Sequence, residues 1–176
     1  MKTTRCVALC GAVSALSAVM LLMTVFPYAT YALAALAGIM LIPAALECGT
    51  RYGVIAYVVT ALLSLLLTPD IEAKWLFVLF FGYYPIVALR LQLWYKVVLA
   101  WVVKFAIFNA AAVAGFFLLI TFMGVPKDEF TIGGMYLPGV LLLLGNAVFV
   151  VYDVALVRVT AMYRVRLHPY VVRLMK

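Results

Sequence analysis

The stretch WLFVLFFGYYPIVALR, residues 75–90, decides how this chain folds. Apolar residues run from Trp75 into a Gly-Tyr-Tyr-Pro segment at 82–85, and further apolar residues lead to a lone Arg90. Trp and Arg are typical of the two interfaces at the ends of a membrane-spanning helix. Pro85 lacks the N–H that would bond the carbonyl four residues earlier, so we expect a kink. Because such backbone needs protein or a water-filled cavity around it, the kinked side should face other helices or a ligand.

The composition is that of an integral membrane protein. Hydrophobic residues make up 69% of the 176 residues and charged residues only 11%, whereas soluble domains are about 45–50% apolar. At about 20 residues per spanning helix, the apolar runs account for about six helices. The sequence therefore predicts an all-α, polytopic membrane helix bundle that forms a single domain over residues 1–176, with no length left for a soluble domain.

Charged and proline-containing loops divide the apolar sequence into six predicted helices. Pro69 is expected to stop the third helix, and Asp70 and Glu72 suit the first turn of the fourth because negative charge is favourable at a helix N-terminus. Pro169 is expected to end the last helical segment. The predicted helices lie at about 6–26, 31–46, 52–67, 73–91, 97–123 and 136–160, followed by a basic cytoplasmic tail at 161–176.

Basic residues fall unequally on the two sides of these helices. One side carries ten, and the other carries only Lys74 and Lys127, while Lys104 lies within a helix. Because Lys and Arg accumulate in cytoplasmic loops, both termini are predicted to be cytoplasmic, with the basic tail near anionic headgroups. The ten are Lys2, Arg5, Arg51, Arg90, Lys96, Arg158, Arg164, Arg166, Arg173 and Lys176.

Neither the three cysteines nor the net charge points to a metal site or to nucleic-acid binding. Cys6, Cys10 and Cys48 are an odd count near predicted cytoplasmic ends, which favours reduced thiols over a disulfide framework. Cys6 and Cys10 could share a metal on one helical face, but without further ligands we interpret them as small packing residues and expect no metal site. We interpret the net charge of +7 as a signal of membrane topology and not of nucleic-acid binding, because no nucleic-acid motif accompanies it.

Four polar residues interrupt the apolar runs of the last two predicted helices: Lys104, Asn109, Asn146 and Asp153. An ionisable group within a spanning helix costs about 2.5–3.5 kcal/mol on insertion scales, so it usually faces the interior and finds a partner. Antiparallel helices would place Lys104 level with Asp153, and Asn109 near Asn146. The pairs are either a structural clamp with interhelical hydrogen bonds or the polar floor of a ligand cavity.

The first predicted helix carries small residues at helical spacing: Ala8, Gly11, Ala12, Ala15 and Ala18. A face of small residues lets two helices approach closely within a membrane. Two interpretations remain open, namely packing inside this chain and a docking face for a partner protein.

The whole chain resembles the substrate-capture subunits, or S components, of energy-coupling-factor vitamin transporters and related bacterial membrane proteins. The similarity covers about six helices with both ends inside, the Ala8-x-x-x-Ala12 face, and the run FFGYYP at 80–85. In that family, alanine-rich faces dock on a shared transmembrane coupling protein that works with an ATPase pair. The resemblance therefore implies a multi-pass protein of the bacterial cell membrane.

The resemblance also implies a binding cavity in the outer half of the membrane, formed by helices four to six. The first external loop, at 27–30, is very short, so the loop at 124–135 is the expected lid. The candidate substrate-binding residues are Tyr83, Tyr84, Asn109, Tyr136 and Asn146.

The sequence thus predicts a membrane subunit that binds a small, vitamin-like nutrient for uptake. The chain has no glycine-rich phosphate loop with its lysine, so the energy is expected from a partner ATPase. The alternative is a structural membrane protein that scaffolds a cell-envelope assembly complex. We expect no enzymatic activity and no cofactor, because the sequence lacks a His-rich metal motif, a Ser–His arrangement and paired carboxylates.

Overall fold

The computed structural model describes residues 2–25, 29–123, 131–132 and 135–174. This part of the chain is almost entirely helical and contains six helical segments that are long and apolar enough to cross a membrane. The predicted all-α class and the predicted number of spanning helices are confirmed. The six segments are Thr3–Val25, Thr30–Glu47, Thr50–Leu67, Ile71–Leu91, Val97–Leu118 and Gly139–Arg166.

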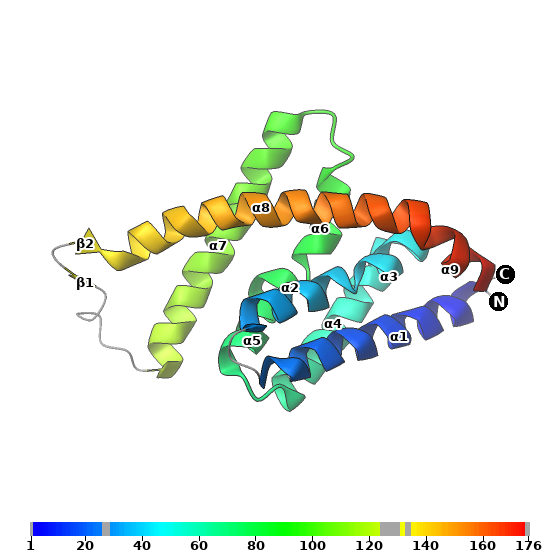
Figure 1. Ribbon diagram of the computed structural model, residues 1–176, viewed down its shortest axis with the longest axis horizontal. Helices are drawn as coiled ribbons and strands as arrows, with labels where there is room; N and C mark the ends of the chain where they lie inside the picture. The colour runs from blue at the N-terminus through cyan, green and yellow to red at the C-terminus, as the bar shows by residue number, and fades with distance from the viewer. Residues whose placement is uncertain (1, 26–28, 124–130, 133–134, 175–176) are drawn as a thin grey trace. The chain divides into compact units, whose positions relative to one another are not determined.

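The chain forms two compact units, which we call unit 1 (Met1–Leu91 with Leu156–Lys176) and unit 2 (Gln92–Ala155). Most of the helices belong to unit 1 (Figure 1). They are α1 (Lys2–Leu22), the 3₁₀ turn η1 (Met23–Val25), α2 (Thr30–Ile39), α3 (Ile42–Glu47), α4 (Thr50–Leu67), α5 (Ile71–Leu76), the π-helix η3 (Phe77–Phe81), α6 (Tyr84–Leu91), the end of α8 (Leu137–Arg166) and α9 (His168–Leu174).

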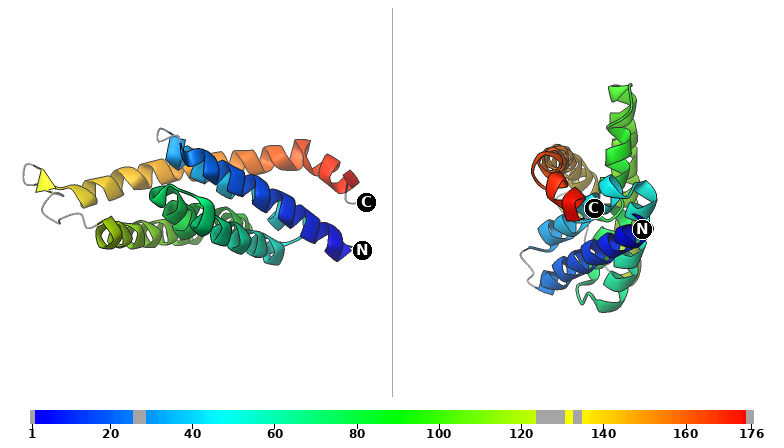
Figure 2. Two further views of the ribbon diagram at one scale, coloured as in Figure 1. Left: turned by 90° about the horizontal axis from the view of Figure 1, so that it is seen from below. Right: turned by 90° about the vertical axis from the view of Figure 1, so that its right-hand side faces the viewer.

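The core of unit 1 lies where α1 packs against α2 and α4 (Figure 2). Small residues also allow α3 and α4 to approach closely, because an added Cβ at Gly53 would lie 2.7 Å from the Cβ of Ala45. Serine hydroxyls of α1 reach the backbones of α2 and α4. Ser14 Oγ donates to the Ala56 carbonyl at 3.2 Å, and Ser17 Oγ donates to the Ala37 carbonyl at 2.7 Å.

The second spanning segment is broken rather than continuous over 31–46. Helix α2 ends at Ile39 and α3 begins at Ile42, with a turn between them. Pro43 is the second residue of α3, where its missing N–H costs little, while its ring prevents the preceding residues from continuing α2.

The loop between α4 and α5 places acidic residues at the start of the next helix, as predicted, although this helix begins at Ile71 and not at about 73. Helix α4 ends at Leu67, just before Pro69, and Asp70 is the N-cap of α5. One oxygen of the Asp70 carboxylate accepts from the Glu72 N–H at 2.9 Å and from the Ala73 N–H at 3.3 Å. These bonds satisfy donors that the first turn of a helix otherwise leaves unpaired.

The segment before Pro85, where a kink is predicted, contains a π-helix. In η3 the Gly82 N–H donates to the Phe77 carbonyl at 2.8 Å, five residues back. Neighbouring helices surround this widened turn. Tyr57 of α4 donates its hydroxyl to the Val78 carbonyl at 2.8 Å, and an added Cβ at Gly38 of α2 would lie 1.9 Å from the Phe81 carbonyl oxygen. The non-standard backbone is therefore enclosed by protein, as membrane-spanning structure requires.

The expectation of three reduced thiols is wrong. Cys6 of α1 and Cys48, which follows α3, form a disulfide with their Cα atoms 5.7 Å apart. The two residues are 42 positions apart in the sequence, so helical spacing could not reveal their proximity. Cys10 is a free, buried cysteine whose thiol donates to the Tyr52 carbonyl at 3.5 Å.

The predicted basic tail is largely helical. Helix α8 runs to Arg166, six residues beyond the predicted end, and α9 follows it at His168. The prediction that Pro169 ends a helix is wrong because Pro169 is the second residue of α9, a position where proline is tolerated.

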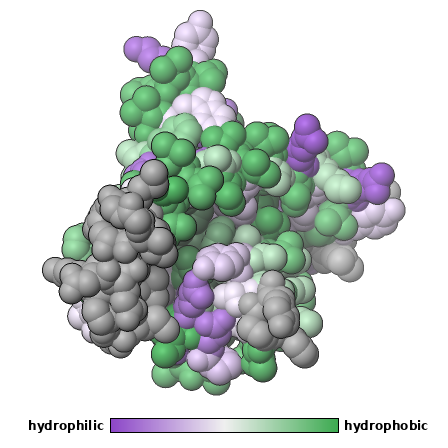
Figure 3. Space-filling view, turned by 60° about the vertical axis from the view of Figure 1, so that its left-hand side comes forward, coloured by the Kyte–Doolittle hydropathy of each residue, from purple (hydrophilic) through white to green (hydrophobic). Residues whose placement is uncertain are grey.

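Unit 2 consists of α7 (Val97–Met123), which has the predicted bounds, and the first part of α8. Two short strands precede α8. Strands β1 (Thr131–Ile132) and β2 (Met135–Tyr136) pair antiparallel, with Thr131 opposite Tyr136. The space-filling view in Figure 3 shows a surface that is mostly hydrophobic, as expected of helices that face lipid.

Candidate functional site

The two helices of unit 2 bring together the charged residues of their apolar surfaces. Lys104 Nζ of α7 donates to Asp153 Oδ2 of α8 at 2.6 Å. The residues are 6% and 1% exposed, respectively. The Lys104 ammonium also lies 4.9 Å from the centre of the Trp101 ring, so the cation has both a carboxylate and an aromatic face as neighbours. Paired in this way, the two charges neutralise each other within an apolar environment.

The second pair joins the same helices five residues further along α7 and seven residues earlier in α8. Asn109 Nδ2 donates to Asn146 Oδ1 at 2.9 Å, and Asn146 Nδ2 donates back to Asn109 Oδ1 at 3.1 Å. Each amide also donates to the carbonyl four residues earlier in its own helix, Phe105 and Leu142, both at 2.8 Å. Both donors of each amide are therefore used within the protein.

Aromatic rings fill the space between the two polar pairs. Phe149 of α8 stacks on Phe108 with ring centres 4.8 Å apart and meets Phe105 edge-on at 5.4 Å. An added Cβ at Gly145 would lie 3.2 Å from the Phe108 ring, so this glycine makes room for an aromatic side chain. The polar pairs thus lie in a packed helical hairpin.

The two tyrosines of the Gly-Tyr-Tyr-Pro segment differ in burial. Tyr84 is fully buried and stacks on Phe80 with ring centres 4.7 Å apart. Tyr83 is half-buried, and its ring meets Tyr57 edge-on at 6.0 Å. Both belong to unit 1. The side chain of Tyr136 lies outside the described residues, as does most of the expected lid at 124–135.

The small-residue face of α1 is exposed. Ala8, Gly11, Ala12 and Ala15 all lie at the surface, and a Cβ added to Gly11 would meet nothing within 4 Å. The buried face of α1 is a different one, formed by Cys10, Val13, Ser14, Ser17 and Leu21. The structure therefore does not use the predicted docking face for packing within unit 1.

Sequence reasoning missed a polar cluster around Glu47, at the end of α3. The Glu47 side chain is 4% exposed. Its Oε1 accepts from the Tyr163 hydroxyl at 3.1 Å and lies 2.6 Å from His168 Nδ1. These residues are 116 and 121 positions away in the sequence. A lone histidine in a basic tail gives no local signal of a role, and only the fold brings His168 to a carboxylate.

Among the described residues, no group of three His, Cys, Asp or Glu could hold a metal ion. At the opposite end of unit 1 from the Glu47 cluster, the acidic side chains accept hydrogen bonds from hydroxyl groups. Thr30 donates to Asp70 Oδ2 at 3.1 Å, and the Tyr31 hydroxyl donates to Glu72.

No family model, curated protein or solved structure matches this chain. Any functional assignment must therefore be argued from the residues themselves.

Proposed function

We propose that the chain is a multi-pass subunit of a bacterial membrane transporter, which captures a small nutrient and docks through α1 on a transmembrane coupling protein. The exposed face formed by Ala8, Gly11, Ala12 and Ala15 is the observation that supports this proposal most directly. Within lipid there is little hydrophobic drive for helices to associate, so close packing of small residues contributes much of the attraction. A face of this kind that is not used internally suits a partner helix.

The energy for uptake would come from a partner ATPase pair. The chain contains no glycine-rich phosphate loop with its lysine, which is the feature that cradles nucleotide phosphates in such enzymes. The predicted division of labour places nutrient binding in this chain and nucleotide hydrolysis in the partner.

Both termini are proposed to be cytoplasmic. The start of α1 and the start of α9 lie at one end of unit 1, because Cys6 bonds Cys48 and His168 contacts Glu47. Arg51, the second residue of α4, lies at that same end. Disulfides are rare in the reducing cytosol. The side of the membrane on which Cys6 and Cys48 lie therefore tests the proposed orientation of the termini directly. After reduction, a membrane-impermeant maleimide should label them only from the cytoplasmic face, and labelling from outside would overturn this orientation.

A scaffold of a cell-envelope complex is the second candidate, and the Asn109–Asn146 pair favours it. Both amides have their donors occupied by each other and by their own helices. A ligand could accept a hydrogen bond from either amide only by replacing one of these bonds, whereas a purely structural protein would keep them. The exposed face of α1 is compatible with either candidate because both need a protein partner.

The experiment is affinity purification of the tagged chain from its native membrane, with mass spectrometry of the proteins and metabolites that accompany it. Recovery of an ATPase pair with a coupling protein, or of a bound metabolite, would support capture. Recovery of cell-wall or division proteins, with neither ATPase nor ligand, would replace capture with the scaffold. Ala8→Leu with Ala12→Leu should abolish recovery of the partner. Ala32→Leu, at an exposed alanine of α2, is the matched control and should preserve it.

A further inference from the structure

Arginines gather around a single turn at one end of unit 1. The turn at 48–49 joins α3 to α4, and Arg51 is the second residue of α4. Arg90, in the last turn of α6, donates its Nε–H to Thr50 Oγ1 at 2.7 Å. Arg51 and Arg90 therefore lie beside the same turn, although they are far apart in the sequence.

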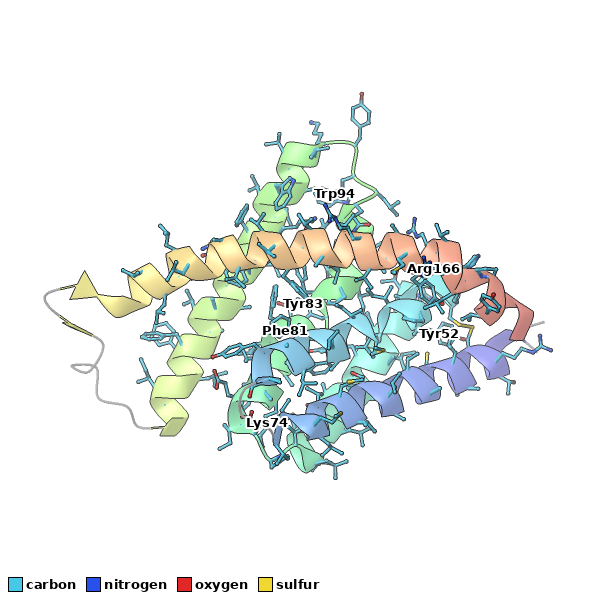
Figure 4. The ribbon with its side chains drawn as sticks, viewed as in Figure 1. Tyr52, Lys74, Phe81, Tyr83, Trp94 and Arg166 are labelled. Atoms are coloured by element: carbon cyan, nitrogen blue, oxygen red, sulfur yellow. A yellow bond between two sulfur atoms is a disulfide. The ribbon has the colours of Figure 1, made fainter. Side chains whose placement is uncertain are left out.

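The end of α8 brings two more arginines to this turn. Tyr163 and His168 both contact the Glu47 carboxylate, at 3.1 Å and 2.6 Å, and the intervening residues include Arg164 and Arg166. Figure 4 shows Arg166 and Tyr52 toward one end of unit 1, and Lys74 toward the other. We call the four residues Arg51, Arg90, Arg164 and Arg166 the arginine end.

The arginine end lacks carboxylates to balance its charge. Within the part of the chain that the structure describes, no carboxylate lies within 4.0 Å of the Arg51, Arg164 or Arg166 guanidinium. Glu47 is the acidic residue next to the turn, and its buried side chain is occupied by Tyr163 and His168. The charge of the exposed guanidiniums is therefore available to an anion from outside the chain.

Apolar side chains alternate with these arginines. Val165 is 78% exposed and Leu167 is 54% exposed, and they flank Arg166. Tyr170 of α9 is 65% exposed. A segment that presents both cationic and apolar side chains is typical of the membrane interface, where the apolar groups enter the headgroup–acyl boundary and the charges meet the headgroups.

We propose that the arginine end is a binding surface for the phosphate groups of anionic phospholipids such as phosphatidylglycerol. The planar guanidinium donates two parallel hydrogen bonds to one phosphate, whereas the lysine ammonium acts as a point charge. The exposed Val165, Leu167 and Tyr170 favour a lipid over free phosphate because only a lipid offers acyl chains for them to contact. This proposal does not rest on the transport assignment.

The test uses the purified full chain in nanodiscs that contain equal amounts of phosphatidylglycerol and phosphatidylcholine, with native mass spectrometry of the lipids retained after release. Wild-type protein should retain phosphatidylglycerol preferentially. The variant R51Q/R166Q, which changes exposed residues of two helices, should weaken that retention by about fivefold for each arginine removed. Retention of phosphatidylglycerol by R51K/R166K should lie between that of wild-type protein and that of R51Q/R166Q, because lysine keeps the charge but lacks the planar guanidinium.

K74Q/K96Q is the control, since it removes two basic residues outside the arginine end and should leave retention unchanged. Thermal unfolding in phosphatidylcholine alone checks that each variant is folded. Equal retention of the two lipids by wild-type protein would overturn the proposal, as would an equal loss in K74Q/K96Q. Displacement of the lipid by millimolar inorganic phosphate would assign the site to free phosphate instead, and full retention by R51K/R166K would contradict the role of guanidinium geometry.

Discussion

Helices of unit 1 meet through small residues and hydroxyls, whereas the α7–α8 hairpin of unit 2 is joined by long polar side chains. In unit 1, Ser14 and Ser17 donate directly to backbone carbonyls of neighbouring helices. In unit 2, Lys104 reaches Asp153, and two asparagine amides meet between the helices. Both regions must hold helices together within an apolar solvent, and they do so through different kinds of side chain.

The difference follows from how closely the backbones approach. Ser14 and Ser17 reach the carbonyls of Ala56 and Ala37, and alanine is small enough to let the helices come together there. Unit 1 is also closely packed at Gly38 and Gly53, whose added Cβ atoms would lie 1.9 Å and 2.7 Å from η3 and α3. Between α7 and α8 the rings of Phe105, Phe108 and Phe149 occupy the contact. Helices held apart by aromatic rings can be joined only by longer polar side chains, so side-chain length matches spacing in each region.

The largest expected effect comes from breaking the charge pair of unit 2. Lys104→Ala would leave the Asp153 carboxylate, 1% exposed, without its cation. An unpaired buried charge costs about 3–5 kcal/mol, and we expect a loss of that size in the free energy of unfolding, measured by detergent titration in mixed micelles. The double variant K104M/D153L removes both charges and should recover most of the loss. Equal losses in the single and double variants would show that the pair does not hold the hairpin.

Unit 1 should lose somewhat less when its covalent link is removed. The variant C6S/C48S frees two residues 42 positions apart, and loss of a disulfide commonly costs about 2–4 kcal/mol by relaxing the unfolded chain. The same titration with and without reductant measures the effect. Wild-type protein should weaken in reductant, while C6S/C48S should not respond further. Cys10→Ala, at the free cysteine, is the control and should keep the response to reductant.

Close approach in unit 1 can be tested at Gly38. The Cβ of Gly38→Ala would lie 1.9 Å from the Phe81 carbonyl oxygen, so α2 and η3 must separate. Overpacking of this kind costs about 1–3 kcal/mol. Gly11→Ala is the matched control, because its Cβ meets nothing within 4 Å and alanine is the better helix former. If the temperature of thermal unfolding shifts equally in Gly38→Ala and Gly11→Ala, the close spacing of the helices does not determine the contact between α2 and η3.

The smallest expected effect concerns the asparagine pair. A double-mutant cycle with Asn109→Leu and Asn146→Leu should give a coupling of about 0.6 kcal/mol and no more than about 1.7 kcal/mol, the range found for interhelical hydrogen bonds in membranes. Ser17→Ala in unit 1 is expected to cost a similar amount, because one hydroxyl–carbonyl bond at 2.7 Å is lost. A coupling near zero would mean that the asparagine pair does not help to join α7 to α8, and that the Lys104–Asp153 pair and the aromatic contacts do.

Local features of the fold could be predicted from the sequence. The apolar runs gave the six spanning segments, and the bounds of α7 agree with those predicted. The cap at Asp70 followed from a carboxylate placed after Pro69. The Lys104–Asp153 contact could be anticipated because a hairpin of two antiparallel helices fixes which depths face each other.

Contacts between distant segments could not be predicted. Cys6 pairs with Cys48, and Glu47 meets Tyr163 and His168, only because the ends of α1, α3, α8 and α9 converge. Helical periodicity contains no information on which ends converge. The interruption of α2 before Pro43 and the π-helix before Pro85 were accessible in principle, since proline disturbs the preceding turn in both cases.

The π-helix has a consequence for how the chain tolerates changes in length. Its Gly82-to-Phe77 bond spans one residue more than an α-helical bond, so deletion of one residue from Phe77–Phe81 would turn it into an ordinary α-helical bond and leave the flanking turns nearly in register. The same deletion between Lys104 and Asn109 would have no spare residue to absorb it, and it would move one polar pair out of register with the other. Length variation in this chain should therefore be tolerated in η3 before it is tolerated in α7.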